Sequence, residues 1–173
     1  GAVPLFVDSE LGTLGMDPEA VSDVLSSRCN FADGVLRHAA TGLRVAAVVP
    51  MHVFGNPVDM DRLLEVCAAY DLPIVEDAAE ALGSRHKGFP CGGLAKAGIL
   101  SFNGNKIVTT GGGGMILTND AELAHRGDAV RGLGVGHFAE IVSRTRSEDV
   151  VAQLGLPHRR EELAQDDRLE GFG

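Results

Sequence analysis

The sequence predicts an α/β fold with a mainly parallel β-sheet and flanking helices. Short apolar segments of strand length alternate along the chain with amphipathic segments of helical period. One apolar segment is hydrophobic at nearly every position, which is typical of a strand covered on both faces. The chain has 173 residues, which is enough for one domain with a buried core.

The first strand and the first helix are expected near the beginning of the chain. The apolar run Val3–Asp8 is a predicted strand. Asp17-Pro18 predicts the start of a helix, because Asp is a preferred N-cap residue and Pro fits the first helical turn. Apolar residues with helical spacing predict the buried side of this helix: Ala20, Val21, Val24 and Leu25.

The longest apolar run, Val45–Phe54, is the strand that is predicted to be covered on both faces. The turn-forming residues Gly55–Pro57 end it. A second helix is predicted over about residues 60–70, with Asp59 or Asp61 as its cap.

Three further short strands are predicted at residues 73–77, 97–102 and 115–118. Asn119 is the predicted cap of the helix that follows, with Glu122 as its capping-box partner. Toward the end of the chain the periodicity weakens, and two short helices are expected there, over residues 147–154 and 161–169.

Charge and hydropathy exclude two classes of partner. The formal net charge is −9 and the chain has no run of Lys and Arg, so it lacks the basic face that a nucleic acid requires. It also has no apolar run that could cross a bilayer and no visible signal peptide, so we expect a cytoplasmic protein with no membrane partner.

Cysteine and histidine patterns predict no metal site. Cys29, Cys67 and Cys91 are widely spaced and form no CxxC pair, which argues against a zinc site and against a disulfide framework. The six histidines show no ligand spacing. His52 follows a predicted strand and could approach a ligand there, but a lone histidine is more often a satisfied core residue.

Two polar motifs follow predicted strands, where α/β sheets bind ligands. The first is Glu76–Glu80: an acid at the end of a buried strand is costly unless it meets a cation or several donors. A helix cap or a structural ion pair is the alternative explanation, and it is favoured when this motif is taken alone. The second is Ser101–Lys106, in which partial burial would make the lysine amine a nucleophile and the serine could hold a phosphate. A solvent-exposed turn is its alternative explanation.

The third motif is the glycine run Gly111–Gly114. Four glycines allow the backbone to pass close to a ligand or to adopt positive φ, and a flexible turn is the alternative. No Lys-Ser/Thr follows, which excludes a Walker A loop. A strand rather than a helix is expected next, which argues against a dinucleotide-binding turn.

The order and the spacing of these motifs resemble one known family. EDAAEALGS, SFNGNK and GGGGMILTND, together with MHVFGNPVDMD and DLPIVEDAAEALGS, resemble the DegT/StrS family of sugar aminotransferases, which use pyridoxal 5′-phosphate (PLP) and have fold type I. The resemblance implies that residues 1–134 are the central part of the large PLP-binding domain. Residues 135–173 match poorly, as a truncated or frameshifted tail would. We therefore expect a piece of a longer protein.

The resemblance implies a role for each of five residues. Lys106 matches the lysine that forms the Schiff base with PLP, and Asp77 matches the acid that pairs with its pyridine nitrogen. Ala79 matches the small residue against the ring face, and Ser101 matches a phosphate-binding hydroxyl. Glu80 stands where many members have Gln or His, near the 3-oxygen of the cofactor. Lys106 and Asp77 are thus the predicted catalytic residues.

The implied function is amino transfer from glutamate, through PLP, to a nucleotide-linked 4-keto-6-deoxy sugar in amino-sugar and glycan biosynthesis. The resemblance also implies a homodimer. Some members have His at the position of Lys106 and are dehydratases, so the lysine favours transamination. A PLP-dependent sugar dehydratase and a non-catalytic fragment or regulator remain the alternatives, and the isolated chain is not necessarily active.

Overall fold

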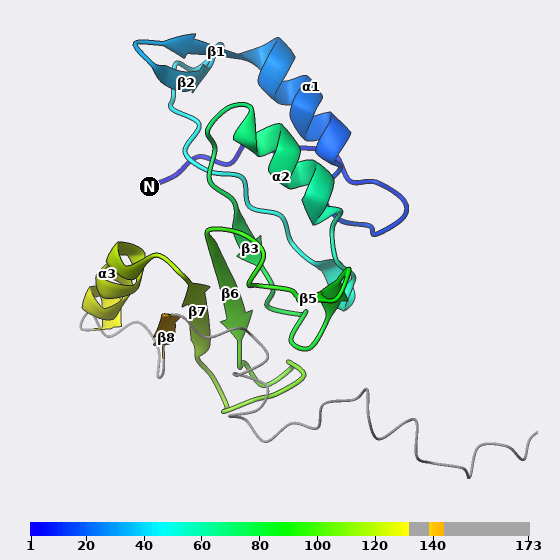
Figure 1. Ribbon diagram of the computed structural model, residues 1–173, viewed down its shortest axis with the longest axis vertical. Coiled ribbons are helices and arrows are strands. Elements are labelled where there is room, and N and C mark those ends of the chain that lie inside the picture. Colours follow the sequence, from blue (N-terminus) through cyan, green and yellow to red (C-terminus); the bar gives the residue numbers. More distant parts are fainter. Residues whose placement is uncertain (132–138, 144–173) are drawn as a thin grey trace, which may run out of the picture.

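A four-stranded sheet is the centre of the computed structural model, which describes residues 1–131 and 139–143 (Figure 1). The spatial order is β3-β6-β7-β8. β3–β6 and β7–β8 are parallel pairs, whereas β6–β7 is antiparallel, because no crossover helix connects these two strands. The predicted α/β fold is confirmed. The strands are β3 (Val75–Asp77), β6 (Ala97–Ser101), β7 (Gly114–Thr118) and β8 (Ala139–Ser143).

The extended segment 48–52 continues the sheet beyond β3. It runs parallel to β3 through bridges at Val48 and Met51. Pro50 interrupts the ladder because it has no N–H group, although its carbonyl oxygen accepts a hydrogen bond from the strand. The prediction that both faces of this segment are covered is wrong: Val49 and Met51 are 53% and 40% exposed. Their neighbours Val48, Pro50 and His52 are buried, so only one face meets the core.

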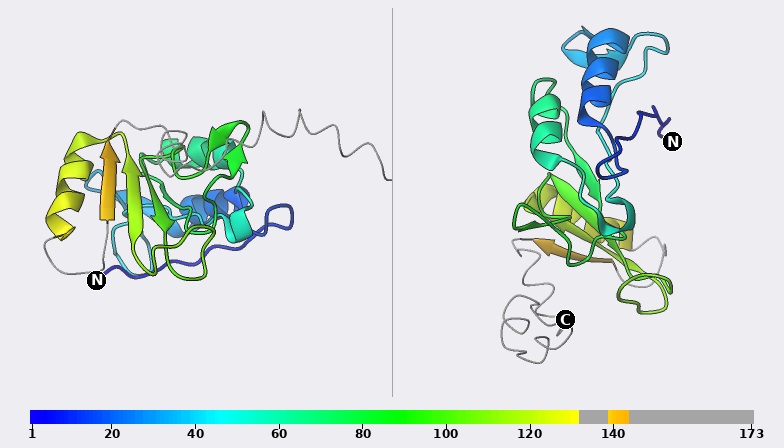
Figure 2. Two further views of the ribbon diagram at one scale, coloured as in Figure 1. Left: turned by 90° about the horizontal axis from the view of Figure 1, so that it is seen from below. Right: turned by 90° about the vertical axis from the view of Figure 1, so that its right-hand side faces the viewer.

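Two helices cover this buried face. α1 (Pro18–Arg28) and α2 (Met60–Ala68) lie side by side, as Figures 1 and 2 show. The predicted caps are confirmed, because Asp17 accepts a hydrogen bond from Glu19 N and Asp59 accepts one from Arg62 N. Together with the segments around them, the helices enclose the larger core, formed by Val21, Leu25, Leu36, Val48, Val58, Met60, Leu63, Val66, Cys67, Leu72 and Ile74.

A smaller core lies between β6, β7 and the chain that leaves β3. Here the backbone at Gly92 lies directly on β6, and a Cβ atom added to Gly98 would be 2.1 Å from the carbonyl oxygen of Gly92. Only a residue without a side chain allows this approach. The members of this core are Ala78, Ala81, Cys91, Leu100, Phe102, Met115 and Leu117.

Some elements differ from the prediction. Val3–Asp8 forms no strand, and Phe6 within it is exposed. Two hairpins were not predicted: β1 (Cys29–Ala32) with β2 (Val35–His38), and β4 (Arg85–His86) with β5 (Phe89–Pro90). Their turns, Asp33-Gly34 and Lys87-Gly88, have positive φ at both residues, which is the geometry that Asp-Gly favours.

The cap of α3 (Ala121–Arg131) also differs by one residue. Asp120, not Asn119, accepts hydrogen bonds from the N–H groups of Glu122 and Leu123, each at 3.0 Å. The helices predicted at 147–154 and 161–169 lie outside the described residues. Among the helices that the structure describes, none is long and apolar enough to span a membrane.

We expect Asp17→Ala to lower the free energy of unfolding by about 1 kcal/mol, because the Glu19 N–H loses its acceptor at the start of α1. Urea unfolding measures the change. Asp23→Ala, at an exposed position inside the same helix, is the matched control and should have little effect. An equal loss in both variants would contradict a capping role for Asp17.

Candidate active site

The predicted site residues gather at one edge of the sheet. β3 and β6 are adjacent parallel strands, so their carboxyl ends meet there. Asp77 is the last residue of β3, and Ala79 and Glu80 follow in the next turn. Ser101 is the last residue of β6, and Lys106 lies in the loop beyond it. Five residues separated by up to 29 positions are therefore brought to one place by the strand order.

Lys106 and Glu80 are joined across the two strand ends. The Lys106 Nζ atom donates to Glu80 Oε1 at 3.3 Å. The side chains are only 17% and 28% exposed, so the lysine is not the free surface residue of the alternative explanation. Glu80 Oε2 accepts a second hydrogen bond, at 3.0 Å, from the N–H of Phe54. The Phe54 N–H and the Lys106 ammonium lower the pKa of Glu80.

The bond from Phe54 depends on an unusual turn. Phe54 has φ 53° and ψ 25°, in the left-handed region, and its side chain is exposed. The next residue, Gly55, also has positive φ, and a Cβ atom there would be 3.0 Å from the carbonyl oxygen of Glu80. Sequence reasoning missed this hydrogen bond. Gly55 signals a turn in the sequence, but nothing in the sequence marks the Phe54 N–H as the group that donates to Glu80.

Asp77 is half-buried at the end of β3. Its Oδ1 atom accepts a hydrogen bond from the N–H of Ala79 at 3.1 Å, which ties the carboxylate to the turn. The preceding residue, Glu76, is fully buried. Successive side chains of a strand point to opposite faces, so Asp77 belongs to the site edge and Glu76 to the core.

Ser101 and Lys106 belong to one tight loop. Ser101 Oγ accepts a long hydrogen bond, at 3.4 Å, from the N–H of Asn103. The N–H of Lys106 donates to the carbonyl oxygen of Asn103 at 3.0 Å, and the Asn103 and Asn105 side chains are hydrogen-bonded to each other at 3.2 Å. These bonds form the turn that presents the lysine.

The glycine run and the residue before it are hydrogen-bonded to Phe102, at the start of this loop. Phe102 donates to the carbonyl oxygen of Gly113 at 3.0 Å and accepts from the N–H of Thr110 at 3.1 Å. Gly111 and Gly113 have φ values of 82° and 108°, which favour glycine. The run therefore allows the chain to return to β7, through the positive φ values that the sequence analysis gave as one use of the glycines.

His52 is a satisfied core residue, as its isolation in the sequence suggested. It is fully buried, and both ring nitrogens have partners: Nε2 lies 3.2 Å from Glu76 Oε2, and Nδ1 lies 3.2 Å from the N–H of Val58. It does not reach the site edge with its ring. Glu76 is the residue that sequence reasoning passed over, although the cost of a buried acid was the correct signal for it.

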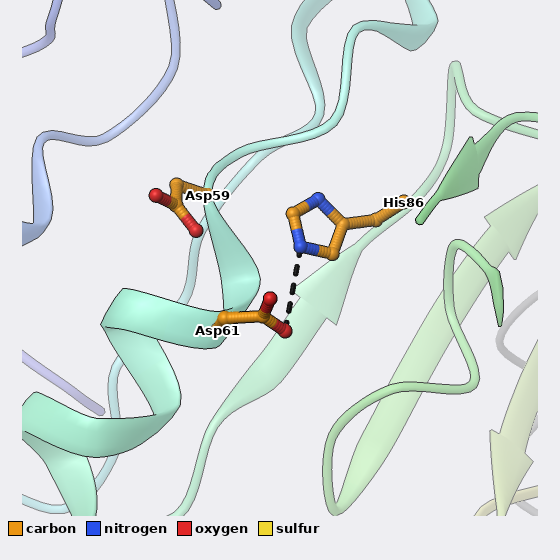
Figure 3. Close-up of side chains that lie close together, drawn as sticks. All are labelled: Asp59, Asp61 and His86. Atoms are coloured by element: carbon orange, nitrogen blue, oxygen red, sulfur yellow. Dashed lines mark ion pairs between the residues drawn. The ribbon is translucent and has the colours of Figure 1, made fainter. Parts of the chain in front are cut away.

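A second group of ligand-type side chains lies away from this edge. Asp59, Asp61 and His86 place one potential ligand atom each within 4.8 Å of one another (Figure 3). Both carboxylates are already engaged: Asp61 forms an ion pair with Lys87 and lies 3.5 Å from His86 Nε2, and Asp59 caps α2. The sequence predicted no metal site, and spacing along the chain could not reveal a group that only the fold assembles.

We expect Glu80→Gln to remove a pH-dependent part of the stability. The pKa of Glu80 is lowered from its ordinary 4.5, so its ionised form stabilises the folded chain at neutral pH. This contribution is lost as the pH falls through the lowered value. The difference in urea midpoint between wild type and Glu80→Gln should therefore shrink below about pH 4.5.

Glu65→Gln is the control for this experiment, because it removes an exposed acid that is paired with Arg62 away from the site. The same pH profile in both variants would contradict a specific contribution from Glu80.

Comparisons with known proteins give one family. Residues 1–161 match the sequence profile of the DegT/DnrJ/EryC1/StrS aminotransferase family. The chain is 33% identical over 180 residues to a GDP-perosamine synthase of Caulobacter vibrioides, covering 99% of this chain and 44% of that protein. It is 37% identical over 133 residues to an L-glutamine:2-deoxy-scyllo-inosose aminotransferase of Streptomyces fradiae, covering 77% and 28%.

The solved structures agree in fold. A crystal structure of DesI, determined in the presence of its TDP-sugar product, is similar with a TM-score of 0.60 and 33% identity. The match covers 76% of this chain and 29% of DesI. An aminotransferase from Psychrobacter cryohalolentis gives a TM-score of 0.63 at 27% identity, with 90% and 40% coverage. The chain thus spans less than half the length of these relatives.

Proposed function

Because the chain belongs to the DegT/DnrJ/EryC1/StrS aminotransferase family, we propose that it is the catalytic part of a PLP-dependent aminotransferase. Its substrates are glutamate and a nucleotide-linked 4-keto-6-deoxy sugar. The observation that carries the proposal is the placement of Lys106 beside Glu80, at the edge where β3 ends in Asp77. The amine comes from the loop after β6, and both carboxylates come from the end of β3 and the turn that follows it.

The donor set at this edge fits the proposed cofactor. PLP, when bound, supplies a carbonyl group that condenses with amines and a ring that accepts an electron pair from the substrate. Lys106 offers the amine, the Asp77 carboxylate suits a protonated ring nitrogen, and Ser101 offers a hydroxyl for the phosphate. Ala79 presents only a methyl group, which leaves room for a flat ring.

The roles of the side chains follow from their chemistry. Lys106 would hold the cofactor through its amine, and its free Nζ would take a proton from the substrate carbon and return it. The Asp77 carboxylate would face the ring nitrogen and favour its protonated form. Glu80 accepts from Lys106 through one oxygen and from the Phe54 N–H through the other, so it orients the amine.

The names of the relatives support the substrate class. One relative is a GDP-perosamine synthase, and DesI was solved with a TDP-sugar product. Another relative is named for an L-glutamine donor. We propose glutamate as the donor for this chain, and glutamine is the competing donor that the experiment includes.

A half-reaction tests the proposal. The chain is loaded with PLP and incubated with L-glutamate or L-glutamine, and the keto acid that is released is measured by mass spectrometry. We expect 2-oxoglutarate from glutamate, and then an amino sugar when a nucleotide-linked 4-keto-6-deoxy sugar is added. A longer polypeptide that contains this chain is tested in parallel, because the relatives are more than twice as long.

The other outcomes identify the alternatives. Cofactor bound at Lys106 without keto acid from either donor, in both polypeptides, would favour a non-catalytic PLP-binding protein. A sugar product that has lost a hydroxyl group instead of gaining an amine would favour a dehydratase.

The setting of the protein is also part of the proposal. We propose that the whole protein works as a homodimer in the cytoplasm and supplies amino sugars for polysaccharide biosynthesis. The support is the resemblance to sugar aminotransferases. Light scattering on the whole protein measures its mass, and a monomer would overturn the homodimer.

A further inference from the structure

We infer that Glu76 and His52 form a buried pair that positions Asp77 at the site edge. The inference rests on the proposed role of Asp77 toward the ring nitrogen of the cofactor. Neither member of the pair faces that edge, and both side chains are fully buried. They act through the backbone of β3 and of the extended segment 48–52, so they are positioning residues rather than catalytic ones.

Glu76 is held by four hydrogen-bond donors. Its Oε1 atom accepts from the N–H groups of Leu94 and Ala95, each at 2.7 Å. Its Oε2 atom accepts from the N–H of Gly92 at 2.6 Å and lies 3.2 Å from His52 Nε2. Burying an ionised carboxylate is costly, but this number of donors can replace its hydration. The carboxylate thereby fastens the loop 92–95 to β3.

The ring of His52 has one protonation state that satisfies both of its partners. Its Nδ1 atom faces the N–H of Val58 at 3.2 Å, so Nδ1 must accept a hydrogen bond and carries no proton. The proton therefore lies on Nε2, from which it is donated to Glu76.

The pair and Asp77 are connected through two backbone bonds. The N–H of His52 donates to the carbonyl oxygen of Asp77 at 3.0 Å, and the N–H of Asp77 donates to the carbonyl oxygen of Pro50 at 2.8 Å. The peptide units on both sides of Asp77 are thus held by the segment that carries His52. The His52 side chain in turn is fixed by Glu76, the residue immediately before Asp77. Together, these contacts fix the backbone position from which the Asp77 side chain extends.

Glu76→Gln tests the pair because glutamine has nearly the same shape as glutamate but cannot accept all four hydrogen bonds. If the new NH₂ group replaces Oε1, it faces the Leu94 and Ala95 N–H groups. If it replaces Oε2, it faces the Gly92 N–H. Either orientation opposes donor to donor inside the core. Val66→Ala in α2 is the matched control, because it weakens the larger core from a helix and leaves the Glu76 and His52 side chains unchanged.

The first measurement is hydrogen exchange at the His52 and Asp77 amides. We expect Glu76→Gln to speed their exchange by about tenfold or more relative to Val66→Ala, compared at equal overall stability. This measurement needs no cofactor. Exchange that rises equally in the two variants would overturn the inference, whether or not the chain binds PLP.

The second measurement uses the absorbance of bound PLP as a function of pH. Asp77→Asn should displace the pH midpoint, because the ring nitrogen loses its carboxylate partner. Glu76→Gln should displace it in the same direction and Val66→Ala should not. A midpoint that moves in Asp77→Asn but not in Glu76→Gln would overturn the positioning role. If the wild-type chain shows no absorbance from PLP bound to Lys106, the result counts against the proposed function. Hydrogen exchange would then still test whether Glu76 and His52 position Asp77.

Discussion

Incubation with PLP followed by borohydride reduction should place the pyridoxyl label on Lys106. The chain has three lysines, and Lys87 and Lys96 are much more exposed, at 67% and 54%, than Lys106 at 17%. Each of the three is paired with one acid, so pairing alone does not separate them. Labelling by exposure alone would favour the other two. Peptide mapping should instead find about tenfold more label on Lys106, because an organised site holds the aldehyde next to its amine.

Lys106→Arg should abolish this label and lower amino transfer by about 10²–10⁴-fold or more, since arginine keeps the charge but neither forms the imine nor moves the proton. Lys96→Arg is the matched control, because it lies at the other end of β6 and pairs with Asp120. Label that is spread over Lys87 and Lys96, or that persists elsewhere at the same level in Lys106→Arg, would show that the chain has no selective site.

Gly98→Ala should be the most destabilising single substitution that we can name in the described structure. The added methyl carbon would be 2.1 Å from the carbonyl oxygen of Gly92 and 2.5 Å from its Cα atom. Both obstacles are backbone atoms, so no side-chain rotation relieves the overlap. We expect a loss of at least about 3 kcal/mol in the free energy of unfolding, measured with urea.

Gly104→Ala is the control for this substitution, because no atom beyond its two chain neighbours lies within 4 Å of the Cβ position at Gly104. It should change stability by less than about 1 kcal/mol. A Gly98→Ala chain that unfolds at the same urea concentration as wild type would mean that the loop at Gly92 does not lie on β6 in solution. The fastening of that loop by Glu76 would then also be in doubt.

The helices and the central strands were predictable because their signals are local. Asp17 and Asp59 cap the helices as expected, and the strands at β3, β6 and β7 follow the apolar runs. The strand prediction for Val3–Asp8 was wrong because an apolar composition does not guarantee that a neighbouring strand is available for pairing. The hairpin at Asp33-Gly34 could have been found, since Asp-Gly between apolar segments is a strong turn signal.

The candidate site was predictable in its members but not in its contacts. The motifs placed Asp77, Glu80 and Lys106 at strand ends, and the parallel pairing of β3 with β6 brings those ends together. The Phe54 N–H that binds Glu80 and the donors that surround Glu76 are backbone groups. Every residue except proline has such an N–H, so no residue type marks the ones that a fold will use. The roles of the five site residues toward PLP stay predictions until they are tested.

The two adjacent acids of β3 also make the length of the preceding segment critical. Because side chains alternate between the faces of a strand, the insertion or deletion of one residue just before Glu76 would exchange the two positions. The shorter Asp77 side chain would then face the core in place of Glu76, and the loop at Gly92 would lose the longer carboxylate that accepts from its N–H. Insertion or deletion of one residue there should therefore abolish both folding and the geometry of the site. Substitutions at Val49 and Met51, on the neighbouring extended segment, should be tolerated much better because these side chains are exposed.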